Sequence, residues 1–235
     1  MEGRAARGSL GPGHAGWQPG TAPAEHALTY GHLISGTIRA ATGRGVGEVF
    51  RREVAVPLAL DAHFGVPVED LARVADVELS APTWPTEVSG QAGSVRWRSL
   101  NRPPGALDVA VLNGQPWRTC EFPAIGLHAT AASIAQFYGS LVDPAGPVAS
   151  LLGSELHSTF CSPVVVAHDR LLEREVAWTP GLQADEYGLG MAGVGGCDAY
   201  ADTRYGLGYA YLTRRLGDHS RSERITAAIE SVLDG

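Results

Sequence analysis

Apolar side chains recur at helical spacing in several stretches of the chain. The pattern predicts a helix over residues 25–42, which Gly43 ends, and a shorter helix over residues 46–54, which ends before Pro57. A helix over residues 130–141 is well defined, because residues 134, 137, 138 and 141 are apolar and share one face. A last helix over residues 222–233 places Ile225, Ile229 and Val232 on one face.

Towards the C-terminus the pattern changes from helical spacing to alternation. Residues 187–191 and 205–212 are predicted to be strands of an antiparallel sheet. The glycine-rich residues between them are expected to form the turn, with Asp198 and Asp202 as turn residues. Residues 75–125 are rich in Pro, Gly and Trp, which predicts irregular chain wrapped around a helical lobe. Residues 1–16 carry five glycines and are predicted to be disordered.

Composition excludes several classes of protein. With 44% hydrophobic and 18% charged residues, the 235-residue chain has the composition of a globular protein. A net charge of −7 argues against nucleic acid or an anionic membrane as a partner. The sequence has no apolar run long enough to span a bilayer, and residues 1–16 do not resemble a signal peptide. The expected location is the cytoplasm.

The ligating residue types are scattered. Cys120, Cys161 and Cys197 lie far apart, which is not typical of a disulfide scaffold or a zinc site. The eight histidines show no i, i+4 pair around a glutamate. We therefore expect no metal and no cofactor.

One segment resembles a known family. Residues 17–31 contain Trp17, then Pro19-Gly20-Thr21, and then His26-Ala-Leu-Thr-Tyr-Gly31. This is similar to the W-x-P-G-T…Y-H-A-L-T-Y-G segment of the serine β-lactamase-related family, which includes class C-like β-lactamases, esterases and DD-peptidases. The resemblance covers residues 17–235. It implies an α+β fold of the serine β-lactamase/transpeptidase type, with a helical lobe over about 22–160 and a partial antiparallel sheet, but without the N-terminal segment that carries the nucleophile.

The resemblance also implies three catalytic elements, and this chain departs from each of them. The nucleophile of the family is the serine of Ser-x-x-Lys, but all 18 basic Lys and Arg residues here are arginine. The family's proton-relaying tyrosine corresponds to Glu25, and the histidine of its His-x-Gly element corresponds to Met191. Glu25 is either a replacement general base or, more simply, a first-turn carboxylate favoured by the helix dipole. Met191 cannot donate a charged hydrogen bond to a substrate.

Five further residues are expected to line the cleft. Gly193, Gly195 and Gly196 match the family's Gly-x-Gly-Gly, and Cys197 replaces the serine that follows it. His128 lies in the stretch leading to the helix over 130–141, where Gly126 stands in place of an asparagine of the family. Cys197 is most simply a small packing residue, since a reactive thiol needs a cationic or histidine neighbour.

Three functional hypotheses follow. The first is a hydrolase-family protein of the esterase/β-lactamase type that is inactive or impaired. The second is a non-catalytic binding or scaffold protein that uses the degenerate cleft, with a small ester or amide as a possible ligand. The third is an enzyme with rebuilt chemistry around Glu25, His128 or Cys197. Without the N-terminal segment of the family, a sheet edge and an apolar helix face would be left uncovered. Such surfaces would favour a homo-oligomer or another partner.

Overall fold

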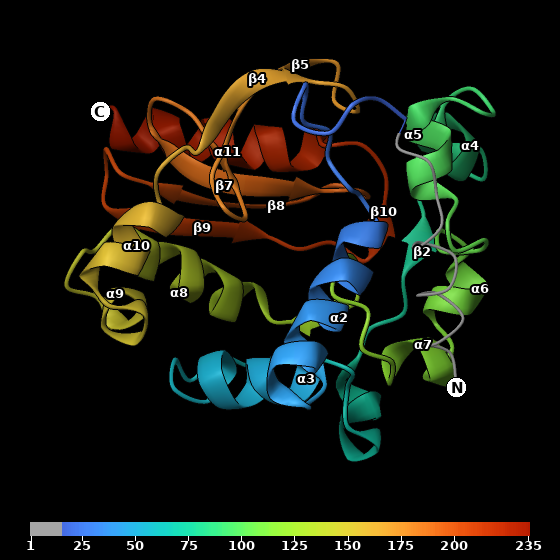
Figure 1. Cartoon of the computed structure of the whole chain (residues 1–235), viewed down its shortest axis with the longest axis horizontal. Helices are drawn as coiled ribbons and strands as arrows, with labels where there is room; N and C mark the ends of the chain where they lie inside the picture. Colours follow the sequence, from blue (N-terminus) through green and yellow to red (C-terminus); the bar gives the residue numbers. More distant parts are fainter. Residues whose placement is uncertain (1–15) are drawn as a thin grey trace.

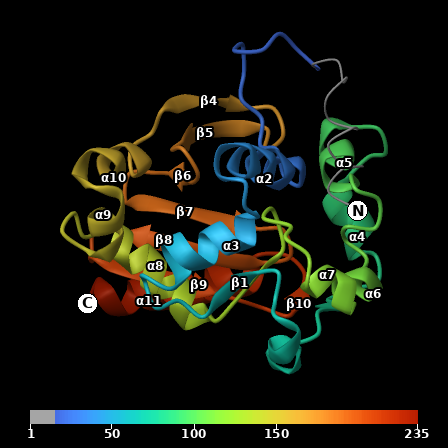
Figure 2. The same cartoon turned by 60° about the horizontal axis from the view of Figure 1, so that its bottom comes forward.

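The computed structural model describes residues 16–235, and the chain forms a sheet flanked by helices together with a second region of short helices (Figure 1). The main sheet is antiparallel and follows the chain order β4-β5-β6-β7-β8-β9. Figure 2 shows these strands in succession from β4 at the top to β9. Their bounds are β4 (Val165–Asp169), β5 (Arg174–Trp178), β6 (Gln183–Ala184), β7 (Gly188–Gly193), β8 (Cys197–Asp202) and β9 (Leu207–Tyr211).

Helices cover both faces of this sheet. On one face lies α8 (Ala131–Leu141), whose Tyr138 and Leu141 join Leu189, Ala199 and Ala201 of the sheet in the largest core cluster. The other face carries α11 (Ser220–Leu233), which Figure 1 shows behind the strands. Next to α8 lie α9 (Pro147–Leu152) and α10 (Ser154–Phe160).

The N-terminal half forms the remaining helices and two small sheets. β1 (Ala62–Phe64) pairs with β3 (Leu127–Ala129), and β2 (Glu78–Leu79) pairs in parallel with β10 (Arg215–Leu216). The helices are α2 (Thr29–Thr42), α3 (Val46–Phe50), a π-helix over Arg51–Ala55, a 3-10 helix over Val68–Arg73, α4 (Trp84–Ser89), α5 (Val95–Leu100), α6 (Val109–Leu112) and α7 (Gln115–Arg118).

The helix predictions hold, with one important shift. The helix over 130–141 is confirmed, and its start is explained by Thr130, whose hydroxyl accepts a hydrogen bond from the Ser133 N–H. The helix predicted from residue 25 begins only at Thr29, with Leu28 as its N-cap. Glu25 therefore precedes the helix and does not stand in its first turn.

The strand predictions are incomplete. Strands over 187–191 and 205–212 are confirmed as β7 and β9, with shifted ends. The segment between them is wrong as a simple turn, because Cys197–Asp202 forms β8, which pairs along its length with both neighbours. Asp198 therefore lies within a strand. Asp202 ends that strand, and its carboxylate accepts hydrogen bonds from the Arg204 and Tyr205 N–H groups of the following turn.

The predicted apolar face of the last helix is largely exposed. Among the described residues, Ile225 is 41% exposed and Val232 is 79% exposed, while Ser222 is the buried position. Ile229, the third residue of the predicted face, is half-buried, and Glu230 pairs with Arg204 of the turn between β8 and β9. The disorder predicted for residues 1–16 lies, apart from Gly16, outside the described residues.

Candidate functional site

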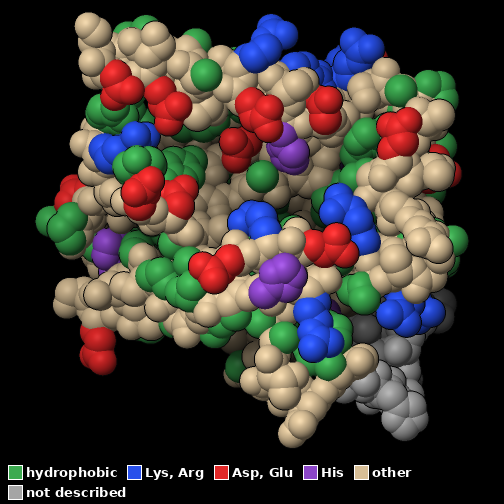
Figure 3. Space-filling model, turned by 90° about the horizontal axis from the view of Figure 1, so that it is seen from above, with side chains coloured by type: hydrophobic (Ala, Val, Ile, Leu, Met, Phe, Trp, Pro, Cys, Tyr) green, Lys and Arg blue, Asp and Glu red, His purple; other side chains and the backbone are tan. Residues whose placement is uncertain are grey.

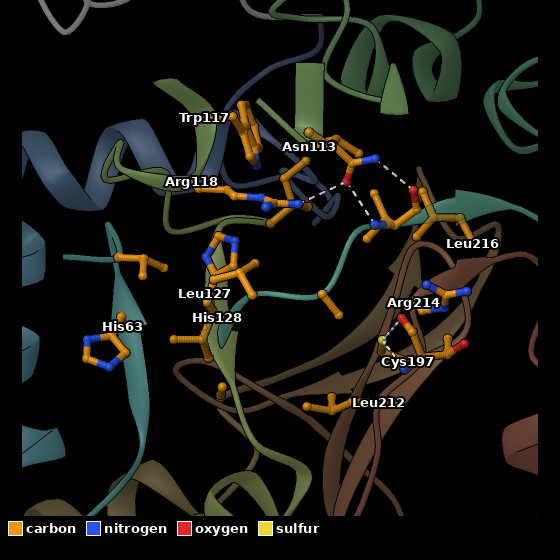
Figure 4. Close-up of a pocket in the computed structure, with 18 of the residues that line it drawn as sticks. His63, Asn113, Trp117, Arg118, Leu127, His128, Cys197, Leu212, Arg214 and Leu216 are labelled. Atoms are coloured by element: carbon orange, nitrogen blue, oxygen red, sulfur yellow. Dashed lines mark hydrogen bonds between the residues drawn. The ribbon is translucent and has the colours of Figure 1, made fainter. Parts of the chain in front are cut away.

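A pocket of about 480 Å³ lies between the short helices of the N-terminal half and the ends of the main sheet (Figure 4). His128 on β3 and Arg118 of α7 stand on one wall, and Cys197 of β8 stands on the opposite wall. Most of the remaining lining is apolar and comes from both halves of the chain: Val66, Val74, Val77, Trp84, Leu107, Leu112, Trp117, Ile125, Leu127, Val194, Leu212 and Leu216.

The ionic groups around the pocket are paired with one another. Arg118 binds Asp76 and is mostly buried, with its guanidinium also 3.4 Å from the Asn113 Oδ1 atom. Arg73 pairs with Asp61 and Asp70, and Arg214 pairs with Glu78 at 3.4 Å. Each of these guanidinium groups already faces a carboxylate, so none of the three arginines offers an unpaired cation to a ligand.

His128 is the polar side chain in the pocket best suited to proton chemistry. Its Nδ1 atom lies 3.1 Å from the Gly126 carbonyl, and a carbonyl can only accept, so Nδ1 carries the proton. Burial lowers the pKa of the imidazole, which keeps it neutral and leaves Nε2 as an acceptor. We find no hydroxyl or thiol bonded to that Nε2 atom among residues 16–235.

Cys197 is held as a packing residue. Its thiol lies 3.4 Å from the Thr213 N–H and 3.7 Å from the Thr213 carbonyl. Burial raises the pKa of the thiol, an effect that exceeds the lowering by the Thr213 backbone and Arg221. A thiol with a raised pKa is a poor nucleophile at neutral pH.

The predicted glycines shape the β7–β8 hairpin and do not line the pocket. Gly193 pairs with Cys197 across the hairpin. Gly195 and Gly196 have φ of +110° and +92°, and a Cβ on Gly196 would stand 2.4 Å from the Asp218 carbonyl oxygen. The turn therefore needs glycine for its backbone conformation and for its close contact with residues 216–218.

Met191 also belongs to the fold. Its side chain packs against the core cluster beneath the sheet, and the Gln183 side-chain amide lies 3.5 Å from its sulfur. The structure thus places Met191 and the hairpin glycines outside the pocket that His128 and Cys197 share. Arg118, Asn113 and Thr213 line that pocket and were not singled out from the sequence, because only the tertiary contacts bring them there.

Glu25 lies against the β4–β5 hairpin and not at the pocket. Its segment is tied to that hairpin, since the Arg170 N–H donates to the Pro23 carbonyl at 3.1 Å and the Arg170 guanidinium stacks on Trp17 at 4.8 Å. Burial, followed by the nearby Asp169, raises the pKa of the Glu25 carboxyl above its ordinary 4.5, while Arg96 and Arg174 oppose this. The interpretation of Glu25 as a first-turn carboxylate favoured by the α2 dipole is wrong.

This placement predicts how Glu25→Gln affects stability. A carboxyl whose folded pKa is raised favours folding below its unfolded pKa, and that advantage is lost as the pH rises through the folded pKa. At pH 7 the ionised Glu25 therefore destabilises the fold, and Glu25→Gln should raise the melting temperature. The gain should shrink as the pH falls towards 4. Thermal melts of both chains at pH 4 and pH 7 measure this, and a lower melting temperature for Glu25→Gln at pH 7 would contradict it.

Comparison with known proteins decides the family. The model of the Beta-lactamase family matches residues 5–233. The chain belongs to the β-lactamase family. It is also 31% identical over 215 residues to the esterase/β-lactamase LipL of Mycobacterium tuberculosis, an alignment that covers 82% of this chain and 48% of LipL. The chain thus spans about half the length of that curated relative.

Solved structures agree with this assignment. A penicillin-binding protein homologue from Caulobacter crescentus is 26% identical, with a TM-score of 0.70 over 92% of this chain and 59% of that one. A family VIII carboxylesterase (23% identical, TM-score 0.74, covering 90% and 59%) and EstA from Arthrobacter nitroguajacolicus Rue61a (20% identical, TM-score 0.80, covering 99% and 66%) share the fold. The predicted α+β fold of the serine β-lactamase/transpeptidase type is confirmed.

Three other features of the described residues bear on function. Residues 16–235 include no helix that is long and apolar enough to cross a bilayer. Within the same range, no group of three or more His, Cys, Asp and Glu side chains is arranged to hold a metal ion. On the face seen in Figure 3, arginine and acidic side chains are interspersed, so no continuous basic stripe forms there.

Proposed function

We propose that this 235-residue chain is a catalytically silent relative of the esterase/β-lactamase type of serine hydrolase. The observation that carries the proposal is the absence of lysine from the sequence, because the family resemblance implies a Ser-x-x-Lys nucleophile whose lysine takes the serine proton. Losing the nucleophile or its base lowers the kcat of a serine hydrolase by up to roughly 10⁶-fold.

The positions of the substituted residues support the same conclusion. Met191 packs into the core, and its thioether has no proton to donate. Glu25 faces Asp169, Arg96 and Arg174 near the β4–β5 hairpin. His128 keeps a free acceptor nitrogen, but no nucleophile within the described chain is bonded to it. A general base without a group to activate does not accelerate acyl transfer.

The test is turnover by the purified chain. We expect hydrolysis of nitrocefin and of p-nitrophenyl butyrate at the rate of a heat-denatured sample, and no mass increase after treatment with a fluorophosphonate probe. Turnover that co-elutes with the folded chain, together with labelling of one serine whose change to alanine abolishes both signals, would refute the proposal. Loss of turnover in a Glu25→Gln or His128→Ala variant would instead favour rebuilt chemistry at that residue.

The pocket favours a binding role as the second candidate. Its largely apolar lining and internally paired charges suit an uncharged or weakly polar small molecule, and this includes an ester or amide. Quenching of Trp84 and Trp117 fluorescence by such a ligand would support binding. Calorimetry should detect no binding to Leu212→Trp, because the larger side chain fills the pocket. Binding should persist in Leu156→Trp, whose exposed side chain is outside the lining.

A further inference from the structure

The outer edge of β4 is an open and apolar strand edge. β4 ends the six-stranded sheet, and among residues 16–235 no strand pairs with its outer side. Val164, Val165 and Val166 are 59%, 43% and 62% exposed, although they alternate between the two faces of the sheet. Neither face is therefore covered at this point. Valine is β-branched and favours the extended backbone conformation, which is the conformation that pairing with another strand requires.

The common protections of an edge strand are missing here. Residues 163–167 read Pro-Val-Val-Val-Ala and carry no charge. Proline stands only at the entrance, and Val165–Asp169 pairs with β5 at every residue. The pairing is irregular only at the entrance, where the Val164 N–H bonds to the carbonyl of Trp178, the residue that pairs with Val165. An exposed strand edge with β-branched residues and no charged gatekeeper is typical of a surface that pairs with another strand.

The opposite edge of the sheet is less open. All five residues of β9 are half-buried, and α8 approaches the strand so closely that a Cβ on Gly208 would stand 2.0 Å from the Gly139 nitrogen. The exposed Ile225 and Val232 of α11 form a helix surface and offer no backbone hydrogen bonds. Within the described chain, β4 combines exposed apolar side chains with an unpaired backbone edge.

We propose that β4 pairs with β4 of a second copy of this chain, antiparallel and centred on Val166. In that register Val166 meets its own counterpart, and Val164 lies opposite His168 of the other copy. Ala177 of β5 lies beside Val166 in the register, which extends the apolar centre of the shared outer face. The joined edges would form one continuous sheet across a two-fold axis, the symmetry most common in homodimers.

Electrostatics allow this pairing even though each chain carries a net charge of −7. The central residues are uncharged, so no like charges face each other at the two-fold axis. His168, the titratable outward residue of β4, lies beside Glu175 of its own β5 and falls roughly 13 Å along the strand from its counterpart. The contact has an apolar centre and a mixed polar rim, which is typical of protein interfaces.

The size of the contact sets the expected affinity. One strand of five residues buries less than the roughly 1,200–2,000 Å² of a stable interface, so the dimer should be weak and concentration-dependent, with a Kd in the micromolar range or above. Sedimentation velocity over a hundredfold range of concentration should show a monomer converting to a dimer. Hydrogen exchange of the residue 164–168 amides should slow as the dimer forms.

The decisive comparison uses two matched valine substitutions. Val166→Lys places like charges opposite each other at the two-fold axis, and should weaken the dimer at least roughly tenfold. Val232→Lys on α11, at a side chain that is 79% exposed, should leave the dimer unchanged. Both variants should keep the wild-type melting temperature. If Val166→Lys lowers it, Val164→Lys provides a second variant of the same strand edge.

Three results would overturn the proposal. A wild-type chain that stays monomeric at the highest concentration has no such edge contact. A dimer that Val232→Lys abolishes and Val166→Lys leaves intact forms through α11. Open-ended assembly beyond the dimer indicates head-to-tail pairing of β4 with β9, since pairing of β4 with itself closes after two copies.

Discussion

Gly208→Ala is expected to unfold the chain or to destabilise it severely. An added Cβ would stand 2.0 Å from the Gly139 nitrogen and 2.2 Å from the Ala135 carbonyl oxygen, and both are backbone atoms of α8. Backbone cannot rotate away as a side chain can, so α8 must separate from β9. That contact holds Tyr138 and Leu141 against the core of the sheet. We expect a loss of about 3 kcal/mol or more in the free energy of unfolding, out of the 5–15 kcal/mol typical of a protein.

Chemical denaturation followed by circular dichroism measures this loss. The matched control is Gly36→Ala in α2, where no atom outside the backbone of its own helix lies within 4 Å of the added Cβ. Alanine is a better helix former than glycine, so this variant should gain up to about 1 kcal/mol. If Gly208→Ala unfolds at the wild-type denaturant concentration, the close packing of α8 on β9 does not exist in solution.

Asp169→Ala should produce the second large loss of stability. The Asp169 side chain is fully buried at the end of β4. One carboxylate oxygen accepts from the Leu171 and Leu172 N–H groups at 2.8 and 2.9 Å, and the other accepts from the Trp178 indole at 3.2 Å. Alanine would leave these donors without an acceptor inside the fold. We expect a cost of about 3–5 kcal/mol, because an unsatisfied buried donor costs about 1–3 kcal/mol.

Asp185→Ala is the matched control for this variant. The Asp185 carboxylate also caps a turn, accepting from the Tyr187 and Gly188 N–H groups at 2.8 and 3.0 Å, but the residue is exposed. Water can replace its hydrogen bonds, so the loss should stay near 1 kcal/mol. Thermal melts and Trp178 fluorescence compare the two variants. Equal losses at both positions would show that burial of Asp169 contributes nothing to stability.

Local signals in the sequence were sufficient for the longer helices and for the family. The short helices α4 to α7 were not predicted, because residues 75–125 were expected to be irregular. The apolar period of three to four over residues 130–141 predicts α8, because helical periodicity depends on neighbours along the chain. The W-x-P-G-T segment and Gly193-x-Gly-Gly likewise identified the family, since such motifs are contiguous. The absence of lysine, on which the proposed function depends, is also a property of the sequence alone.

Strand boundaries and the site needed the tertiary structure. The glycines of residues 193–196 suggested a turn that extends to Asp202, but pairing with β7 and β9 makes Cys197–Asp202 a strand. Strand pairing joins residues distant in sequence, and local propensity does not report it. The strands over residues 165–184 were not predicted for the same reason, and neither was the open edge of β4.

The surroundings of each candidate residue were decided by packing between distant segments. Glu25 was expected at a helix start, but contacts between residues 17–25 and the β4–β5 hairpin place it beside Asp169 and Arg174. Met191 faces the core because alternation along β7 turns its side chain towards α8. By itself the sequence determined the longer helices, the family and the missing lysine. Only the tertiary structure decided burial, charge environment and exposed edges, because these depend on what the rest of the chain places around a residue.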